Sequence, residues 1–311
     1  MQDIAHGERA GELARPAGVG GQEGHDGLGP VAQIAAGYGV SIFQPQSTQV
    51  EMHAGIVDNF FTGVSPDPYT ATAAANFVLE QGVKNVVLFT SDEGGSWSAR
   101  TPLWFGDVIE AGGGKVLSKL NYSFGTSDWA PQIAEIKALG EPVDAVYISS
   151  IMPDVGVLVR QLRGAGIDAW VVGADGFDDP SLDAIGSDDA ALLDKVVFAT
   201  LAPSHADSAV TEFRAACDAI GIDVPGLFPA TGADTVKAVA WAVEKSGSTD
   251  PEAIADAIRN ADSIPVLTVD SISFKETRTF AQRNIPVVGF QDGKRVLLSS
   301  KIPANVPGDW N

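Results

Sequence analysis

The sequence has little cysteine and little positive charge. Cys217 is the one cysteine among 311 residues, so no disulfide forms within the chain and no CxxC pair exists. Lys and Arg number 20 against 40 Asp and Glu, which gives a formal net charge of −20. A surface this acidic repels phosphate backbones and anionic membranes, so we expect no nucleic-acid partner. Net charge of this size also favours a soluble monomer.

Long apolar runs are absent as well. No stretch approaches the length of a transmembrane helix. Residues 1–28 have neither a basic n-region nor an apolar h-region, so the chain as given carries no signal peptide and would by itself stay in the cytoplasm. This segment is Gly-rich and aperiodic, and we expect it to be irregular.

The motifs of common enzymes are missing. GSWSA, which begins at Gly95, ends in Ala where a nucleophile elbow needs Gly, and no P-loop occurs. GVGGQEG near the start misses the dinucleotide-binding pattern and follows no strand. The histidines are scattered without metal-ligand spacing: His6, His25, His53 and His205. We therefore predict a protein that is not an enzyme and holds no cofactor and no metal.

What the chain does have is a regular alternation of strands and helices from about residue 29. PYTATAAANFVLEQG (68–82) is typical of a helix, and NVVLFTS (85–91) of a strand that is buried on both faces. IPVVGFQDGKRVLLS predicts a hairpin that turns at Asp292 and Gly293. Such alternation gives parallel sheets with helices on both faces. Further helices are predicted near 97–111, 129–139, 154–165, 206–220, 231–246 and 250–260, strands near 39–43, 115–122, 144–150, 169–175 and 195–201, and crossovers between two lobes at 60–68, 200–206 and 280–286.

Polar residues follow several of these strands directly. In open α/β sheets ligands bind at the carboxyl ends of the strands, so these loops are the candidate site. Hydroxyls, amides, carboxylates and aromatic rings at this edge suit a small polar or zwitterionic ligand. The candidates are Gln46, Ser47, Thr48, Ser96, Trp97, Ser150, Ile151, Asp175 and Phe177.

Each candidate also has a purely structural interpretation. Ser47 and Thr48 are good helix caps, and Trp97 fits a helix core as well as a binding site. Asp175 precedes Gly176, a pair typical of turns. We favour ligand contact for Asp175 because it lies at the carboxyl end of a strand.

Several segments in a fixed order resemble one family. GTSDWAPQIAEIKALGEPVDAVYISSIMPDVGVLVRQLRGAGIDAWVVGADGFDDPSL is similar to the branched-chain amino-acid type (leucine/isoleucine/valine-binding) of ABC-transporter solute-binding proteins. SGSTDPEAIADAIRN and the C-terminal hairpin resemble it too, and the likeness runs from about residue 29 to the end. It implies the two-lobe periplasmic-binding-protein type I fold, an α/β fold in which each lobe is a mostly parallel sheet flanked by helices. It also implies a periplasmic location, an amino-acid-like ligand and an ABC permease as membrane partner.

The resemblance also implies roles for particular residues. The family's first-lobe Ser-Pro-x-x-Thr loop falls on Gln44 to Thr48, where the Thr hydroxyl and nearby backbone N–H groups would bind the ligand carboxylate. The family's ammonium-binding acid falls on Asp175. Two aromatic positions fall on Ser96, next to Trp97, and on Ile151, and these departures put a strictly branched-chain ligand in doubt.

The front of the chain departs most from the family. Two βα units and a signal peptide are not recognisable, so we expect a truncated or mis-started reading frame and an incomplete first lobe. The expected division is 29–66 with 200–284 for the first lobe, and 67–199 with 285–311 for the second. A cytoplasmic amide- or amino-acid-responsive sensor on the same scaffold is the alternative to a transport component.

Overall fold

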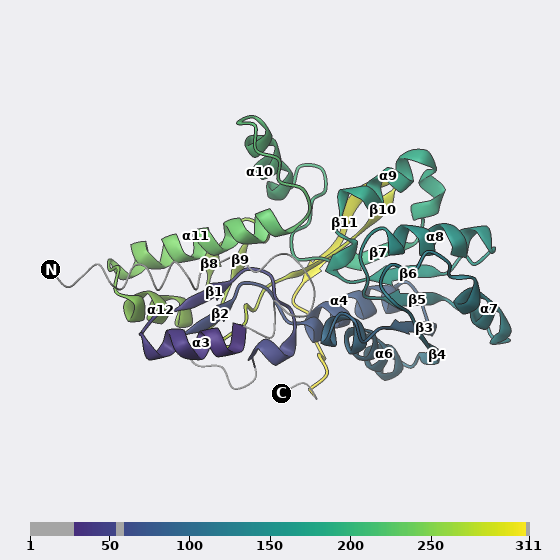
Figure 1. The fold of residues 1–311 in the computed structure, drawn as a ribbon, viewed down its shortest axis with the longest axis horizontal. Helices are drawn as coiled ribbons and strands as arrows, with labels where there is room; N and C mark the ends of the chain where they lie inside the picture. Colours follow the sequence, from purple (N-terminus) through teal and green to yellow (C-terminus); the bar gives the residue numbers. More distant parts are fainter. Residues whose placement is uncertain (1–27, 54–58, 309–311) are drawn as a thin grey trace.

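The computed structural model describes residues 28–53 and 59–308. Figure 1 shows two lobes side by side, with the connecting segments between them. The segment 1–27, for which we expected irregular structure, lies outside the described residues, and Leu28 already begins a helix. None of the described helices is long and apolar enough to cross a bilayer.

The second lobe is built on a seven-stranded sheet in the order β11-β10-β7-β6-β5-β3-β4. The strands from β3 to β7 are parallel, whereas β10 runs antiparallel to β7 and to β11. The fold class predicted from the sequence is confirmed. The strands are β3 (Asn85–Thr90), β4 (Lys115–Asn121), β5 (Ala145–Ile148), β6 (Trp170–Gly173), β7 (Val196–Ala199), β10 (Ile285–Gln291) and β11 (Lys294–Lys301).

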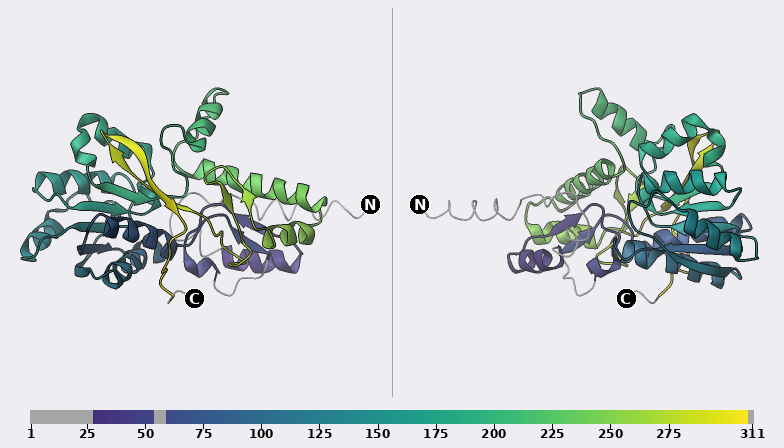
Figure 2. Two further views of the ribbon diagram at one scale, coloured as in Figure 1. Left: turned by 180° about the vertical axis from the view of Figure 1, so that it is seen from behind. Right: turned by 45° about the vertical axis from the view of Figure 1, so that its right-hand side comes forward.

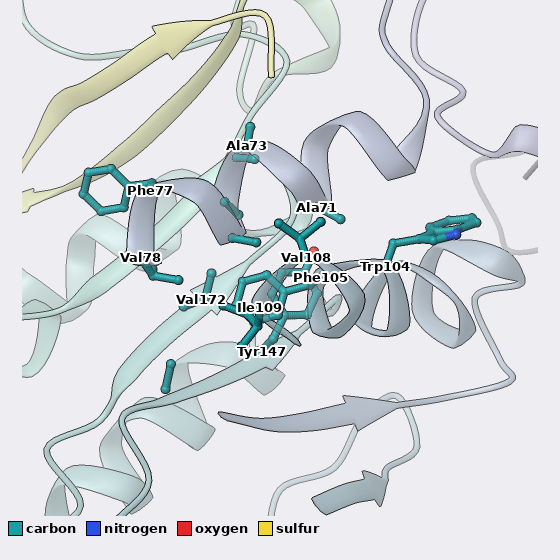
Figure 3. Close-up of a cluster of buried hydrophobic side chains, with 14 of the residues drawn as sticks. Ala71, Ala73, Phe77, Val78, Trp104, Phe105, Val108, Ile109, Tyr147 and Val172 are labelled. Atoms are coloured by element: carbon teal, nitrogen blue, oxygen red, sulfur yellow. The ribbon is translucent and has the colours of Figure 1, made fainter. Parts of the chain in front are cut away.

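Helices cover both faces of this sheet because its strands are apolar on both sides. On one face α4 and α6 pack on a core in which Phe105 stacks on Tyr147, with 4.4 Å between ring centroids (Figure 3). The other face packs around Trp129, Leu158 and Phe177. The helical elements are α4 (Asp67–Glu80), α5 (Ser96–Ala99), α6 (Thr101–Ala111), α7 (Ala130–Ala138), α8 (Asp154–Gly164), η2 (Asp175–Phe177), α9 (Pro180–Asp188) and η3 (Ala190–Leu193).

The first lobe has short strands and its own core. β1 and β2 pair in parallel, β8 and β9 antiparallel, and Phe43, Phe61 and Phe274 meet edge to face or tilted. Helix α10 stands away from the rest in all views (Figure 2). The elements are α3 (Leu28–Gly37), β1 (Ile42–Gln44), η1 (Val50–His53), β2 (Phe60–Thr62), α10 (Ala209–Asp218), α11 (Phe228–Ser246), α12 (Pro251–Arg259), β8 (Ile264–Pro265) and β9 (Ser271–Ile272).

Two local predictions differ from the structure. The helix expected over 97–111 is divided into α5 and α6 at Arg100, directly before the Thr101–Pro102 pair that opens α6. The first crossover is shorter than expected, because residues 60–62 form β2 and α4 begins at Asp67. The hairpin prediction holds: Asp292 and Gly293 both have positive φ, as a two-residue turn of this kind requires.

One buried arginine joins the three segments that connect the lobes. Arg283, in the third crossover, donates from Nη1 to the Gly63 carbonyl at 3.1 Å and from Nη2 to the Leu201 carbonyl at 2.8 Å. Its Nη2 also donates to the Thr268 hydroxyl at 2.7 Å, and Asp234 lies 3.8 Å from Nη1. Burial lowers the pKa of Arg283 to about 10, and the charge of Asp234 partly offsets this. The crossovers therefore share one hydrogen-bonded centre.

Candidate functional site

The candidate site lies where the carboxyl ends of the second-lobe strands meet a loop of the first lobe. Ser91 follows β3, Ser149 and Ser150 follow β5, and Asp175 follows β6. Because β3, β5 and β6 are neighbouring parallel strands, these residues share one edge of the sheet. The first lobe contributes the loop that follows β1.

In the first-lobe loop, backbone N–H groups bind the side chain of Gln44 at the start of the same loop. The side-chain oxygen of Gln44 accepts hydrogen bonds from the backbone N–H groups of Gln46, at 2.7 Å, and Ser47, at 2.6 Å. These two N–H groups lie in the loop where the ligand carboxylate is expected, and in this structure they donate to Gln44. Thr48 is buried, and its carbonyl accepts the N–H of Asp67 at 2.8 Å. Its hydroxyl lies beside the carboxylate of Asp67.

Asp175 is buried on the second-lobe side and is held by Trp97. The indole Nε1 of Trp97 donates to Asp175 Oδ1 at 2.9 Å. Burial raises the pKa of Asp175 to about 6, although the hydrogen bond from Trp97 lowers it. The neighbouring Gly176 must be Gly, because a Cβ there would lie 2.4 Å from the Ser150 carbonyl and 2.8 Å from the Trp97 ring. The Asp-Gly pair therefore lets the carboxylate lie at the N–H edge of the indole.

A second buried acid, Asp67, was missed by the sequence analysis. It is the first residue of α4 and only 1% exposed, and its side chain makes no capping hydrogen bond. No donor in the described part of the chain reaches hydrogen-bond geometry with either carboxylate oxygen. Burial raises the pKa of Asp67 to about 8; the nearby Thr48 hydroxyl lowers it, and the charges of Asp175 and Glu51 raise it further. An Asp before Pro68 at a helix start is typical of a cap, so no pattern in the residues around Asp67 indicated this environment.

Unpaired hydroxyls surround the two acids. Among the described residues, the hydroxyl groups of Tyr147, Ser149 and Ser150 are buried and have no partner in hydrogen-bond geometry. Burial raises the pKa of Tyr147, the nearby Ser149 hydroxyl lowers it, and the charges of Asp67 and Asp175 raise it further, so the phenol lies within electrostatic reach of both acids. Buried polar groups are nearly always paired, and such a cluster indicates a place for water or a ligand.

The structure brings some of the sequence-predicted residues together and separates others. Thr48, Trp97, Ser150 and Asp175 lie around the buried cluster with Asp67. Two predicted residues lie elsewhere. Phe177 is fully buried in the second-lobe core, 6.0 Å from Phe198 between ring centroids, and Ile151 is 49% exposed.

Ser96 has a different partner from the one expected. Its hydroxyl donates to Glu51 Oε2 at 2.6 Å, and Arg100 Nη1 lies 3.5 Å from Glu51 Oε1. Glu51 belongs to η1, whereas Ser96 and Arg100 belong to the α5 region of the second lobe. These contacts join the two lobes at the rim of the cluster.

Surface hollows of the described chain lie away from this cluster. One of about 500 Å³ is lined by Glu80, Lys301 and Ile302, and one of about 410 Å³ lies beside Pro203 and Leu267. No group of three or more metal-binding side chains gathers within the described residues. The candidate site is therefore identified by its buried polar side chains and not by a surface hollow.

A two-lobed α/β molecule with polar loops of both lobes facing each other defines a class of ligand-binding protein. The chain belongs to the periplasmic binding protein family, whose profile it matches over residues 23–294. It is 26% identical to the Leu/Ile/Val-binding protein BraC3 of Rhizobium johnstonii over 272 residues, 86% of this chain and 71% of that protein. It is 25% identical over 233 residues to the leucine-, isoleucine-, valine-, threonine- and alanine-binding protein of Pseudomonas aeruginosa, covering 74% of this chain and 60% of that one.

Solved structures show the same fold. The leucine-binding protein LivK of Thermotoga maritima superposes with a TM-score of 0.72 and 24% identity, covering 88% of this chain and 76% of that one. A solute-binding protein of an ABC transporter from R. palustris in complex with benzoate gives a TM-score of 0.71 with 17% identity, over 89% and 75% of the two chains. The same fold thus occurs in a protein named for leucine and in one solved with benzoate.

Proposed function

We propose that this chain captures an amino acid or a similar small polar solute between its two lobes and delivers it to an ABC permease. The observation that carries the proposal is the buried second-lobe cluster of Asp67, Asp175 and the Tyr147, Ser149 and Ser150 hydroxyls, beside which the Thr48 loop of the first lobe lies. The names of the relatives support an amino-acid ligand. The same kinship supports a periplasmic location and binding without chemical conversion.

Different residues of the site bind the negative and the positive group of the ligand. The Thr48 and Ser150 hydroxyls are donors for a ligand carboxylate, and Asp175 accepts from a ligand ammonium group. Trp97 holds Asp175 in place and presents its ring beside it. A buried charge without a partner is heavily penalised, so ligand and site must match in charge. The proposal also includes ligand contact by Gln46, Ser47, Ser96, Ile151 and Phe177.

The proposed lobes follow the crossovers. Residues 29–66 and 200–284 form the first lobe, and 67–199 and 285–311 the second. Loops of both lobes reach the cluster, so a bound solute bridges them. We propose that the chain acts as a monomer, as its high negative charge favours.

Calorimetric titration of the purified chain with the twenty amino acids, simple amines and simple carboxylates tests the function. We expect saturable binding of one chemical class with one site per chain. The fluorescence of Trp97 reports the same event, and Trp97→Phe should lose that signal. Absence of binding across the whole panel would contradict the amino-acid assignment.

A further inference from the structure

A surface hollow of about 410 Å³ lies beside the crossovers. Its walls come from both lobes and from two of the three crossovers. The first lobe contributes the start of α10 and the loop between β8 and β9, and the second lobe contributes β11. The second crossover contributes Pro203 and His205, and the third contributes Asn284. None of the described residues that line the hollow belongs to the candidate site, so an occupant binds at a separate place.

The loop between β8 and β9 connects the hollow to the hydrogen-bonded centre of the crossovers. Thr268 lines the hollow and is 4% exposed, and its hydroxyl accepts from Arg283 Nη2 at 2.7 Å. The Thr268 N–H donates to Asp234 Oδ1 at 3.1 Å, and its hydroxyl donates to Oδ2 of the same carboxylate. Arg283 in turn donates to the carbonyls of Gly63 and Leu201. An occupant of the hollow therefore lies against a residue that is bonded directly to Arg283.

The hollow has an apolar wall that three elements supply. Leu267 and Val269 lie on the loop between β8 and β9, Val210 lies on α10, and Leu297 lies on β11. Leu297 is 41% exposed. Covering such a side chain with an aliphatic group removes apolar area from water, which favours binding. The hollow also falls within the range of about 300–1,000 Å³ that is usual for small-molecule sites.

The polar groups of the hollow favour a cationic solute over an anionic one. Asp270 lines the hollow and is exposed, and none of the described lining residues is Lys or Arg. His205 lines it too, and its Nδ1 is buried without a hydrogen-bond partner among the described residues. The His205 carbonyl accepts from the Ser208 N–H at 3.2 Å and from the Thr211 hydroxyl at 2.8 Å, which fixes the residue at the start of α10. A buried polar atom without a partner indicates a place for water or a ligand group.

We propose that this hollow is a second binding site, for a small amine with an aliphatic body, and that its occupant acts on the hinge formed by the crossovers. The ammonium group pairs with Asp270, and the aliphatic body covers Leu267 and Leu297. The net charge of −20 attracts such cations toward the protein. Because the walls come from both lobes, the occupant favours the angle between the lobes at which it fits. The inference goes beyond the proposed function, since it involves none of the residues proposed to bind the transported solute.

Calorimetric titration of the full chain with cyclohexylamine, cyclohexanol and cyclohexanecarboxylate at pH 7 tests the charge preference. The three probes share one ring and differ in charge. We expect the amine to bind about tenfold more tightly than the carboxylate, since Asp270 attracts one and repels the other. Asp270→Asn should weaken the amine about three- to fivefold, as for a partly exposed ion pair, and leave the alcohol unchanged.

A pair of leucine variants tests the apolar wall. Leu297→Ala should weaken the amine and the alcohol alike, about three- to tenfold, because it removes apolar area that the ring covers. Leu298→Ala is the matched control: Leu298 is also 41% exposed, lies on the same strand and is not a lining residue. This variant should change neither affinity.

Hydrogen exchange locates the amine, and scattering reports its effect on the hinge. With saturating cyclohexylamine we expect amide exchange to slow in residues 203–210 and 266–270 and to stay unchanged in residues 174–178 of the candidate site. Small-angle scattering under the same conditions should show a changed radius of gyration. An unchanged radius would overturn the action on the hinge.

Four results would overturn the site itself. Cyclohexylamine does not bind, it binds no more tightly than the carboxylate, or Leu297→Ala behaves as Leu298→Ala does. In the fourth, Asp175→Asn abolishes amine binding while Asp270→Asn does not, which places the amine in the candidate site. Each of these results leaves the proposed function standing, because that function is tested by titration with amino acids.

Discussion

At the scale of single residues, the site depends on two acids whose burial disfavours the ionised form of the carboxyl group. Asp175 has one hydrogen-bond donor from a side chain, Trp97, and Asp67 has none in good geometry within the described chain. Burial raises the pKa of both, to about 6 and about 8. A buried acid is costly for the empty protein and selective for a cationic ligand, so these two residues link stability to binding.

Asp175→Asn should weaken binding of any ammonium-bearing solute. The change keeps the shape and removes the charge, and loss of one partner of a buried charge pair costs about 2–5 kcal/mol, or roughly 30- to several-thousand-fold in affinity. Calorimetric titration with the best solute measures it, and an uncharged analogue of that solute is the control. Unchanged affinity would show that Asp175 has only a structural role in the turn with Gly176.

Asp67 should make the empty protein less stable as the pH rises. Its folded pKa of about 8 lies above the usual value, so its contribution is full below about pH 4 and is lost as the pH rises through 8. Asp175 acts in the same direction, with its loss running from about pH 4 to about pH 6. From pH 5 to pH 8 we expect the free energy of unfolding to fall by roughly 2–4 kcal/mol on account of Asp67.

Urea unfolding of the parent and Asp67→Asn at pH 5, 6, 7 and 8 checks this. The stability of the variant relative to the parent should increase steadily with pH. Asp223→Asn, which removes an exposed carboxylate from the loop between α10 and α11, should follow the parent. A constant difference between parent and Asp67→Asn would mean that Asp67 is ionised throughout, contrary to its buried, unpaired position.

At the scale of elements, the charged network around Arg295 anchors the loop that carries Asp175. Arg295, on β11, donates from Nε to Asp183 at 2.7 Å and from Nη2 to the Asp179 carbonyl at 2.8 Å, and it also contacts Asp178. Its Nη1 donates to Ser204 in the second crossover at 3.2 Å. One side chain thus ties the C-terminal hairpin to the binding loop and to a crossover.

Arg295→Lys should destabilise the protein by about 3–5 kcal/mol, because a single ammonium cannot replace these bonds and Asp178 stays buried without its partner. Lys301→Met on the same strand is the control. It breaks the exposed pair with Glu80, which is worth at most about 1 kcal/mol. Equal losses in chemical denaturation would show that the network adds nothing beyond a surface ion pair.

The sequence predicted elements better than contacts. Long periodic segments such as α4 and β3 were found within two residues of their bounds, because burial of one face or of both leaves a clear pattern. β2 was missed, since three residues hold no period and the strand exists through its pairing with β1. Asp67 escaped notice because the groups that make it unusual, Asp175 and Glu51, come from other elements. The Gln44 side chain that occupies the loop N–H groups likewise has no sequence signature.

At the scale of the whole molecule, two lobes meet through three short segments and a rim contact. Arg283 joins the segments by donating to Gly63 and Leu201, and we expect the crossovers to move together as one hinge. The rim contact is Glu51 with Ser96 and Arg100. Hinges of this kind let a ligand shift the balance between open and closed arrangements.

We expect Glu51→Gln to open the ligand-free protein without changing the ligand-bound one. The rim pair is half exposed and contributes at most about 1 kcal/mol, but that suffices to shift a nearly balanced equilibrium about fivefold. The variant keeps the size of the side chain and loses the charge that Arg100 faces.

Small-angle scattering should show a larger radius of gyration for ligand-free Glu51→Gln than for the parent, and the same compact value for both at saturating solute. Lys115→Met, which breaks an exposed pair within the second lobe, controls for loss of a surface charge and should leave the radius unchanged. If solute compacts neither protein, the lobes form a rigid body, and the contact between Glu51 and Ser96 is a permanent part of it.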